Sequence, residues 1–429
     1  MKIGEMIGKQ MRMNTVLGLI AFFTFNLIDT LVSEKAFAND FLYTGTEVKG
    51  SAGAGITQSR GSASLDYNPS NMMFTKNLSL RLDISSLDLK HGYIPDDPAR
   101  EKTSFEVRAI PPSLGLVYQF KQVALGVSFI PTGAGEREFT LSQETDLGAI
   151  PVRVVSNQAS YRLSAAVAAR VNSLLSLGAA VQNLSESSST QVFLADNSIP
   201  ILPEGEMVID TEEQGNFFRI LLSTKLNLSK RWELNLVYKN QVQKDYDGQA
   251  YSLLEGSEYK ETSKVGFLPN EYGVGLSLQL KKLALFGEFR YLSYSQGRAI
   301  QNDGLSQNEE DELDLIDVIE LAVGIKAKVF KRTKVSLAYA YLPKNIGDGS
   351  EGTSEQVDYK VLGPNVGDFK AINRSVLAAG LVYKINPKIR MLSSLNFVSG
   401  KRVVDEAYAN SGRYDLDIVE ISFGTLFHL

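Results

Sequence analysis

The chain has 429 residues, 44% of them hydrophobic, with a formal net charge of −5, no cysteine and two histidines. The absence of cysteine excludes structural disulfides, a lipoprotein anchor and thiolate chemistry, and the negative charge argues against nucleic acid as a partner. After the first 38 residues no stretch is apolar enough for a membrane-spanning helix, so any crossing of a bilayer has to be made by strands closed into a barrel.

The first 38 residues have the three parts of a secretory signal peptide. Residues 2–12 carry three cations, residues 15–28 are almost entirely apolar, and Ala36 and Ala38 frame an A-x-A cleavage site. A transmembrane anchor is the alternative, but the apolar run is shorter than the roughly 18 residues that a span requires and ends in Asp29. We predict cleavage near Ala38 and export of the mature chain.

Residues 39–76 do not alternate between apolar and polar positions and are dense in small side chains, above all in 50–55 and 61–64. Such a segment either packs closely against other backbone or remains flexible, and it is too long to be a simple linker. Asn68-Pro69 lies within it, and this dipeptide taken alone favours a turn that opens the following strand.

Fourteen stretches then alternate between apolar and polar residues, which is typical of strands with one apolar face. In the clearest stretch, Tyr272, Val274 and Leu276 share one face, while Gly273 and Ser277 lie on the other. The predicted strands are 77–90, 105–120, 122–131, 156–171, 174–185, 215–228, 231–245, 264–280, 283–296, 313–330, 333–343, 372–385, 388–402 and 413–429.

Short polar turns and long loops alternate between these strands. The short turns include 281–282 and 331–332, and the predicted long loops include 132–155 and 186–214. A soluble sandwich also alternates, but runs of about 10 residues match a tilted membrane span better than a sandwich strand of about 5 or 6. We therefore predict an all-β fold: a transmembrane antiparallel β-barrel of about 14 strands, with residues 39–76 as a plug in its lumen.

The chain ends and loops indicate the partners of such a barrel. Residues 422–429 resemble the terminal strand that the outer-membrane barrel assembly machinery reads, with Gly424, Phe427 and Leu429 at the characteristic spacing. The last residue of that strand is usually aromatic, whereas here it is leucine. The acidic loop 302–317 has carboxylates of the kind that bind calcium, or that contact lipopolysaccharide through divalent ions. Their spacing fits no calcium-binding loop, so a solvated loop is the simpler interpretation. The predicted location is the outer membrane of a Gram-negative bacterium.

Two stretches resemble the FadL/TodX-like family of outer-membrane transporters for long-chain fatty acids and aromatic hydrocarbons. The small-residue run is followed by Asn68-Pro69-Ser70 and then a first strand, and residues 114–135 read LGLVYQFKQVALGVSFIPTGAG, with a glycine-containing strand leading into Pro-x-Gly. Ser70 stands where the family has alanine.

The resemblance implies passive transport of a hydrophobic small molecule through a hatch-plugged barrel, without a cofactor or metal, and we take the barrel as a monomer. It places the hatch pivot at Asn68, Pro69 and Ser70. It places the N-terminal ligand contacts at Asn39, Asp40 and Phe41, and a kink that permits lateral release in the third strand, at Gly126, Phe129, Pro131 and Gly133.

Two rival functions follow from the same residues. An enzyme is disfavoured because the two histidines, His91 and His428, are predicted at opposite ends of the barrel and no catalytic motif accompanies either. Inward charges such as Glu288 with Arg290 are expected in the wet wall of any barrel. A general or substrate-selective diffusion porin remains the alternative, although it leaves the segment 39–76 unexplained.

Overall fold

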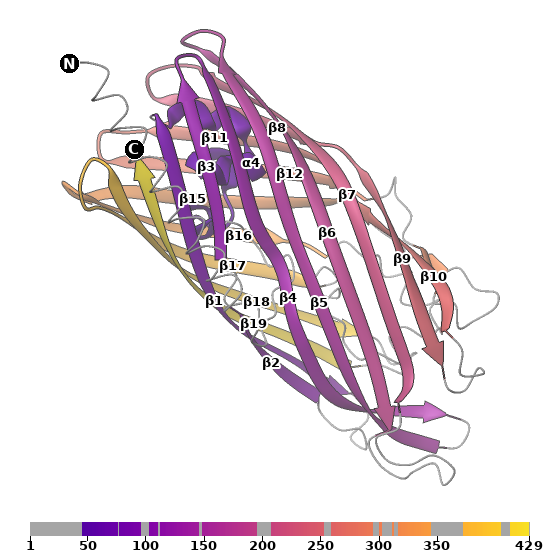
Figure 1. The fold of residues 1–429 in the computed structure, drawn as a ribbon. Helices are drawn as coiled ribbons and strands as arrows, with labels where there is room; N and C mark the ends of the chain where they lie inside the picture. Colours follow the sequence, from indigo (N-terminus) through magenta and orange to yellow (C-terminus); the bar gives the residue numbers. More distant parts are fainter. Residues whose placement is uncertain are drawn as a thin grey trace, which may run out of the picture.

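A computed structural model of the chain (Figure 1) describes residues 45–75, 77–95, 103–109, 112–145, 148–194, 207–252, 259–294, 300–302, 311–312, 316–344, 372–404 and 412–428. The predicted signal peptide, the predicted ligand contacts Asn39, Asp40 and Phe41, and most of the acidic loop 302–317 lie outside these residues.

In the described ranges, nineteen strand segments form one sheet, and because five spans are each interrupted once, the sheet has fourteen spanning strands, as predicted. The spans are, in chain order, β1 (Leu78–Pro95), β2 with β3 (Thr103–Ala109 and Pro112–Phe120), β4 (Val123–Thr145), β5 (Gly148–Arg170), β6 (Leu175–Leu194), β7 (Met207–Asn227), β8 with β9 (Trp232–Lys239 and Val242–Ser252), β10 with β11 (Tyr259–Leu268 and Asn270–Gln279), β12 with β13 (Leu283–Ser293 and Ile300–Asn302), β14 with β15 (Asp311–Glu312 and Val318–Phe330), β16 (Thr333–Leu342), β17 (Asn373–Lys384), β18 (Ile389–Val404) and β19 (Gly412–His428).

The sheet closes on itself because the first and last spans pair. β1 is antiparallel to β19, from Ser79 opposite His428 to Pro95 opposite Gly412, and its other edge pairs with β2 and β3. A closed barrel leaves no sheet edge, so the backbone N–H and C=O groups of the spans are paired within the wall. The predicted antiparallel β-barrel is therefore confirmed.

The two faces of the wall differ as the alternation predicted. On β11 the side chains of Tyr272, Val274 and Leu276 are exposed on the outside, whereas Gly273 and Ser277 are buried on the inside. Exposed Val, Leu, Ile, Phe and Tyr side chains also occur on nearly all of the remaining spans. An outer surface of this composition is suited to the hydrocarbon of a bilayer.

The helices in the described part of the chain are all short, and none of them is long and apolar enough to cross a membrane. They lie before β1, in residues 45–75, which are almost completely buried inside the barrel near the end where the spans are joined by tight turns (Figure 1). The predicted plug is confirmed, and we call residues 45–75 the hatch. Its helices are α2 (Thr46–Lys49), α3 (Gly55–Gln58), η1 (Gly61–Ala63), α4 (Ser64–Tyr67) and η2 (Pro69–Phe74).

Several strands are longer than predicted, and several predicted loops, 132–155 and 186–214 among them, were partly wrong. Residues 132–145 and 148–155 belong to β4 and β5, and the predicted loop 186–214 is occupied at both ends by β6 and β7. The added part of β6, residues 186–191, is almost wholly polar. A strand with water on both faces has no reason to alternate, so the period of two ends before the strand does. His91, predicted in a loop, lies within β1.

Candidate functional site

Apolar side chains of the hatch pack against apolar residues on the inner face of the wall. Leu65, Met72 and Met73 are fully buried in a cluster with Val117, Ala124 and Ala168, and Ile56 is buried against Ala180, Leu221 and Val237. Burying a side chain of this size contributes about 1.5–3 kcal/mol. These contacts attach one side of the hatch to spans β3 to β8.

Glycines on the inner face of the wall make room for the hatch. A Cβ added at any of them would come within 3 Å of a hatch atom or of a wall side chain that bonds the hatch, which is closer than real Cβ atoms come. They are Gly115, Gly126, Gly178, Gly273, Gly275, Gly380 and Gly424. We call this set the glycine seat; it is distributed around the barrel, so the hatch backbone fits the wall on several sides.

Gly178 makes the closest approach between wall and hatch backbone. A Cβ at this position would lie 2.6 Å from the carbonyl carbon of Pro69 and closer still to the backbone nitrogen of Ser70. Backbone atoms cannot move aside as a flexible side chain can. Gly178 therefore determines where the predicted pivot, Asn68 to Ser70, can lie.

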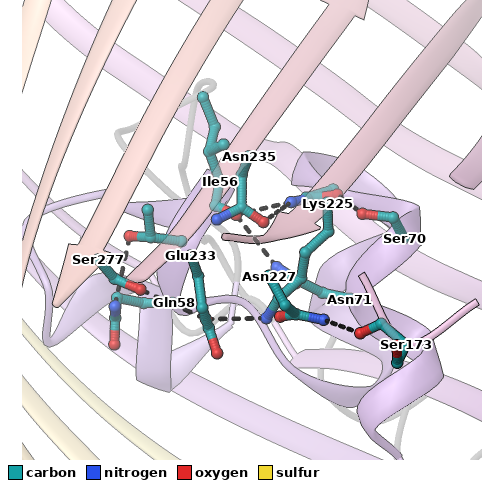
Figure 2. Close-up of polar contacts among 12 residues, drawn as sticks. Ile56, Gln58, Ser70, Asn71, Ser173, Lys225, Asn227, Glu233, Asn235 and Ser277 are labelled. Atoms are coloured by element: carbon teal, nitrogen blue, oxygen red, sulfur yellow. Dashed lines mark hydrogen bonds and ion pairs between the residues drawn. The ribbon is translucent and has the colours of Figure 1, made fainter. Parts of the chain in front are cut away.

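The Asn68 side chain connects three parts of the site. Its Nδ2 donates to the backbone oxygen of Ile56 at 2.8 Å and to Oδ1 of Asn235 on β8 at 3.0 Å, and its Oδ1 accepts from the Ser70 hydroxyl at 2.5 Å. The Asn71 amide also donates to the Ile56 oxygen, at 3.1 Å (Figure 2). The extra hydroxyl of Ser70 thus has a partner within the hatch.

Asn68 lies between α4 and η2, Ser70 is the second residue of η2, and each also has a partner on the wall. The Ser70 backbone N–H donates to the Ser223 hydroxyl on β7 at 2.9 Å. The strand β1 begins only at Leu78, eight residues beyond Ser70, so the Asn68-Pro69 turn joins two hatch helices and does not open the strand directly.

Charged groups hold the opposite side of the hatch. The Lys326 ammonium on β15 lies 2.5 Å from a Glu47 oxygen, and Lys49 forms an ion pair with Glu420 on β19. Thr46 donates its backbone N–H and its hydroxyl to Asp83 on β1, at 3.2 and 2.6 Å. Lys49, Glu420, Thr46 and Asp83 are buried, and Glu47 and Lys326 are largely so, so loss of one partner would leave an uncompensated group in the lumen.

Glu47 remains charged in this environment. Burial raises the pKa of Glu47, but the positive charges of Lys326, Arg60 and Arg81 outweigh burial and lower the pKa from 4.5 to about 2. A carboxylate with a lowered pKa stabilises the folded state fully above pH 4.5 and loses this contribution as the pH falls through about 2. The attachment of α2 to the wall is therefore insensitive to pH near neutrality.

Glu288 and Arg290 both face the lumen, as expected of charges on the inner wall. Glu288 accepts the backbone N–H and the hydroxyl of Thr57, at 2.6 and 2.8 Å, and Arg290 lies 3.4 Å from Glu320. Asp66 of α4 accepts from the Ser164 hydroxyl at 2.9 Å. The hatch thus supplies to Glu288 donors that no local pattern in the sequence reveals.

The third span, β4, contains an irregularity at the predicted kink. Its register with β5 shifts between Pro131 and Gly133, which marks a β-bulge at Thr132. Its described ladder with β3 ends at Phe129 opposite Leu114, although β4 continues to Thr145 beside β5. Proline has no N–H to donate, so Pro131 suits a position where pairing on one side stops.

Gly126, the remaining residue of the predicted kink, faces the hatch. A Cβ added there would lie 2.9 Å from the Met72 sulfur and 3.0 Å from a Leu65 methyl carbon. Gly126 therefore belongs to the glycine seat, a role that sequence reasoning missed. The signal in the sequence was that glycines recur at the inward positions of the strands, which the period of two identifies.

On the outer surface, beside the end of the β3–β4 ladder, lies an open apolar groove of about 540 Å³. The first pair of residues that lines the groove is Leu116 opposite Val127, two residues along the ladder from the Leu114–Phe129 pair. Small Ala165 and Ala179 lie among larger outward side chains, which explains the depression. The lining residues are Leu116, Tyr118, Leu125, Gly126, Val127, Ala165, Ala166, Val167, Ala179, Ala180, Val181 and Ile220.

A double-mutant cycle will test the Asn68 connection. We expect Asn68→Ala and Asn235→Ala each to make docking of the hatch less favourable, with a coupling of about 1 kcal/mol between them, because they share one hydrogen bond. The measurement is the rate of limited trypsin cleavage at Lys49 and Arg60 in the folded barrel. Strict additivity of the two substitutions would show that the bond contributes nothing.

Comparison with known proteins completes the description. No protein-family model and no curated protein sequence matches the chain. A FadL homologue from Pseudomonas aeruginosa aligns over 91% of this chain and 98% of its own, with 14% identity and a TM-score of 0.69. The toluene transporters TodX of Pseudomonas putida and TbuX of Ralstonia pickettii align over 91% and 90% of this chain and 100% and 98% of theirs, with 12% and 11% identity and TM-scores of 0.61 and 0.57. The resemblance to the FadL/TodX-like family is thus confirmed at the level of the fold.

Proposed function

We propose that this chain is an outer-membrane channel for the passive uptake of small hydrophobic molecules, gated by the hatch. The main observation in support is that residues 45–75 fill the barrel near its tight-turn end and fit against the glycine seat. A barrel that served only as an aqueous pore would have no need for a backbone-to-backbone fit of this kind. A closed hatch protects an apolar ligand site from water until a conformational change opens it.

The exit proposed for the ligand is lateral, through the wall at β4. Three features support it: the β3–β4 ladder ends at Phe129, a β-bulge follows at Thr132, and the apolar groove begins two residues away on the outer surface. An apolar molecule leaving here passes directly into an apolar phase. In this proposal Gly126, Phe129, Pro131 and Gly133 form the exit, and Asn68, Pro69 and Ser70 the moving pivot.

The class of cargo is inferred from the structures of similar fold. Two of them are toluene transporters, and a further one, the CymD channel, is described as a monoaromatic hydrocarbon channel. An apolar ligand of this kind gains about 0.8 kcal/mol per CH₂ on entering a dry site, so binding favours hydrophobic over polar solutes. Long-chain fatty acids remain within the proposal, as do Asn39, Asp40 and Phe41 as ligand contacts.

The proposed setting follows from the same fold. In this proposal the precursor is cleaved after Ala38 and the barrel assembly machinery inserts the mature chain into the outer membrane. The barrel functions as a monomer, with lipopolysaccharide around its loops. An enzymatic role is disfavoured by the distance between the histidines: His428 lies opposite Ser79 of β1, and His91 is twelve residues further along β1. At a rise of about 3.3 Å per residue this is roughly 40 Å.

The diffusion porin is the competing function, and two measurements on the purified barrel separate it from the proposal. In planar bilayers we expect no large steady ion current, and in detergent we expect saturable binding of radiolabelled toluene or oleate. Large steady currents without binding would favour the porin.

Deletion of residues 39–41 tests the family-based ligand contacts. We expect weaker binding of the labelled hydrophobic ligand, because these residues precede the hatch in the chain, while the barrel still assembles and residues 45–75 remain resistant to trypsin. Affinity equal to that of the full-length mature chain would remove Asn39, Asp40 and Phe41 from the site.

A further inference from the structure

One sector of the tight-turn end of the barrel is strongly basic. Three neighbouring turns, at 280–282, 331–332 and 385–388, and the strand ends beside them carry nine cations and no Asp or Glu. All but Arg390 are exposed. We call these nine residues the basic rim: Lys281, Lys282, Lys328, Lys331, Arg332, Lys334, Lys384, Lys388 and Arg390.

The three turns are joined directly to one another. The Lys328 N–H donates to the backbone oxygen of Lys282 at 2.7 Å, and the Lys384 N–H donates to the backbone oxygen of Arg332 at 2.8 Å. The basic rim is therefore one continuous surface and not a set of unrelated lysines.

The rest of the tight-turn end is different. With the strand ends beside them, the turns at 121–122, 171–174 and 228–231 carry five cations, Lys121, Arg170, Lys225, Lys230 and Arg231, and one acidic residue, Glu233. The chain as a whole has a net charge of −5, so a sector with nine positive charges is not explained by composition. Mutual repulsion of nine cations is unfavourable unless an anionic partner offsets it.

We propose that the basic rim binds the anionic head groups of phospholipids, phosphatidylglycerol in the first instance, in the leaflet at the tight-turn end. Short turns of outer-membrane barrels face the periplasm, where the adjoining leaflet consists of phospholipid. The cations in the turns, Lys281, Lys282, Lys331, Arg332 and Lys388, are placed to meet these head groups, and the strand-end cations on the inner face add to the positive potential of the sector. The basic rim thus recruits negative lipid to one side of the barrel.

The side chains next to the basic rim fit a lipid partner better than a soluble one. Phe330, beside Lys331, is 70% exposed, and the Tyr383 ring next to Lys384 is exposed as well. Aromatic rings at this depth occupy the boundary between hydrocarbon and head groups. Lys331, in the turn one residue beyond Phe330, is thus placed at the phosphate level of the same leaflet.

The experiment compares lipid quenching at two tryptophans in vesicles of phosphatidylcholine mixed with brominated phosphatidylglycerol or brominated phosphatidylcholine. The single tryptophan of the chain, Trp232, adjoins Lys230 and Arg231 outside the basic rim and is 42% exposed. A second protein with Trp232→Phe and Phe330→Trp moves the reporter to the basic rim. We expect phosphatidylglycerol to associate roughly two- to fivefold more strongly than phosphatidylcholine at position 330, and with little preference at Trp232.

Two charge-matched triple variants complete the test, each checked for heat-modifiable migration as a sign of the folded barrel. Lys281→Gln, Lys282→Gln and Lys331→Gln should abolish the preference at position 330, and 0.5 M salt should weaken it. Lys121→Gln, Lys230→Gln and Arg231→Gln should leave it unchanged. A preference that is absent at position 330, equal at both reporters or equally affected by both variants overturns the proposal. If an acidic protein is the true partner, these protein-free vesicles will show no preference.

Discussion

Replacing Gly178 by valine is expected to displace the hatch while leaving the barrel folded. The new side chain would occupy the space of the Pro69 and Ser70 backbone, which cannot move without breaking the hydrogen bonds of Ser70 to Ser223 and of Asn68 to Asn235. Overpacking of this kind costs about 1–3 kcal/mol, which corresponds to roughly 5- to 150-fold faster exposure of the hatch. Trypsin cleavage at Lys49 and Arg60 measures this rate, and planar-bilayer recordings should show new ion current.

The control is a glycine on the other face of the wall. A Cβ at Gly287 on β12 would meet nothing closer than 3.8 Å, so Gly287→Val should keep the hatch as resistant to trypsin as in the parent protein. If Gly178→Val is equally resistant, the glycine seat does not position the hatch, and the gate proposed here loses its structural basis.

The barrel itself was predictable from local pattern. Alternation places Leu276 toward lipid and Ser277 inside wherever the wall separates hydrocarbon from the lumen, so strand number and face could be derived without tertiary information. Short polar turns such as 281–282 were equally informative, because they mark where one strand ends and the next begins. The pattern failed at the ends of the long strands, most clearly in β6, where residues 186–191 are all polar and show no alternation.

The contacts of the hatch were not predictable in the same way. Lys326 meets Glu47 from 279 residues away, and Glu288 meets Thr57 from 231. No spacing rule connects such positions, so the sequence placed Glu288 on the inner wall without identifying Thr57 as its partner. The Asn68-Pro69-Ser70 motif was informative because its geometry is local, yet its partner Asn235 became visible only in the folded barrel.

Leu276→Arg is expected to impair assembly of the barrel severely. Leu276 faces outward on β11, and it lies five residues from the turn at 281–282, close to the middle of the apolar band. An arginine on the lipid face costs about 2–4 kcal/mol at the bilayer midplane, which is a large fraction of the stability of a folded protein. The measurement is the folded fraction after refolding into phosphatidylcholine vesicles, resolved by heat-modifiable migration.

The matched substitution is Leu280→Arg, at an exposed position in the turn that directly follows β11. Both leucines are 41% exposed, so the two variants differ in depth and not in burial. Near the interface the arginine costs only about 0–1 kcal/mol, because its head group reaches water and phosphate. Leu280→Arg should therefore fold almost as well as the parent chain. Equal folding of the two variants would mean that β11 does not present this face to hydrocarbon, and the membrane-spanning assignment of the whole wall would have to be withdrawn, since all fourteen spans share one closed sheet.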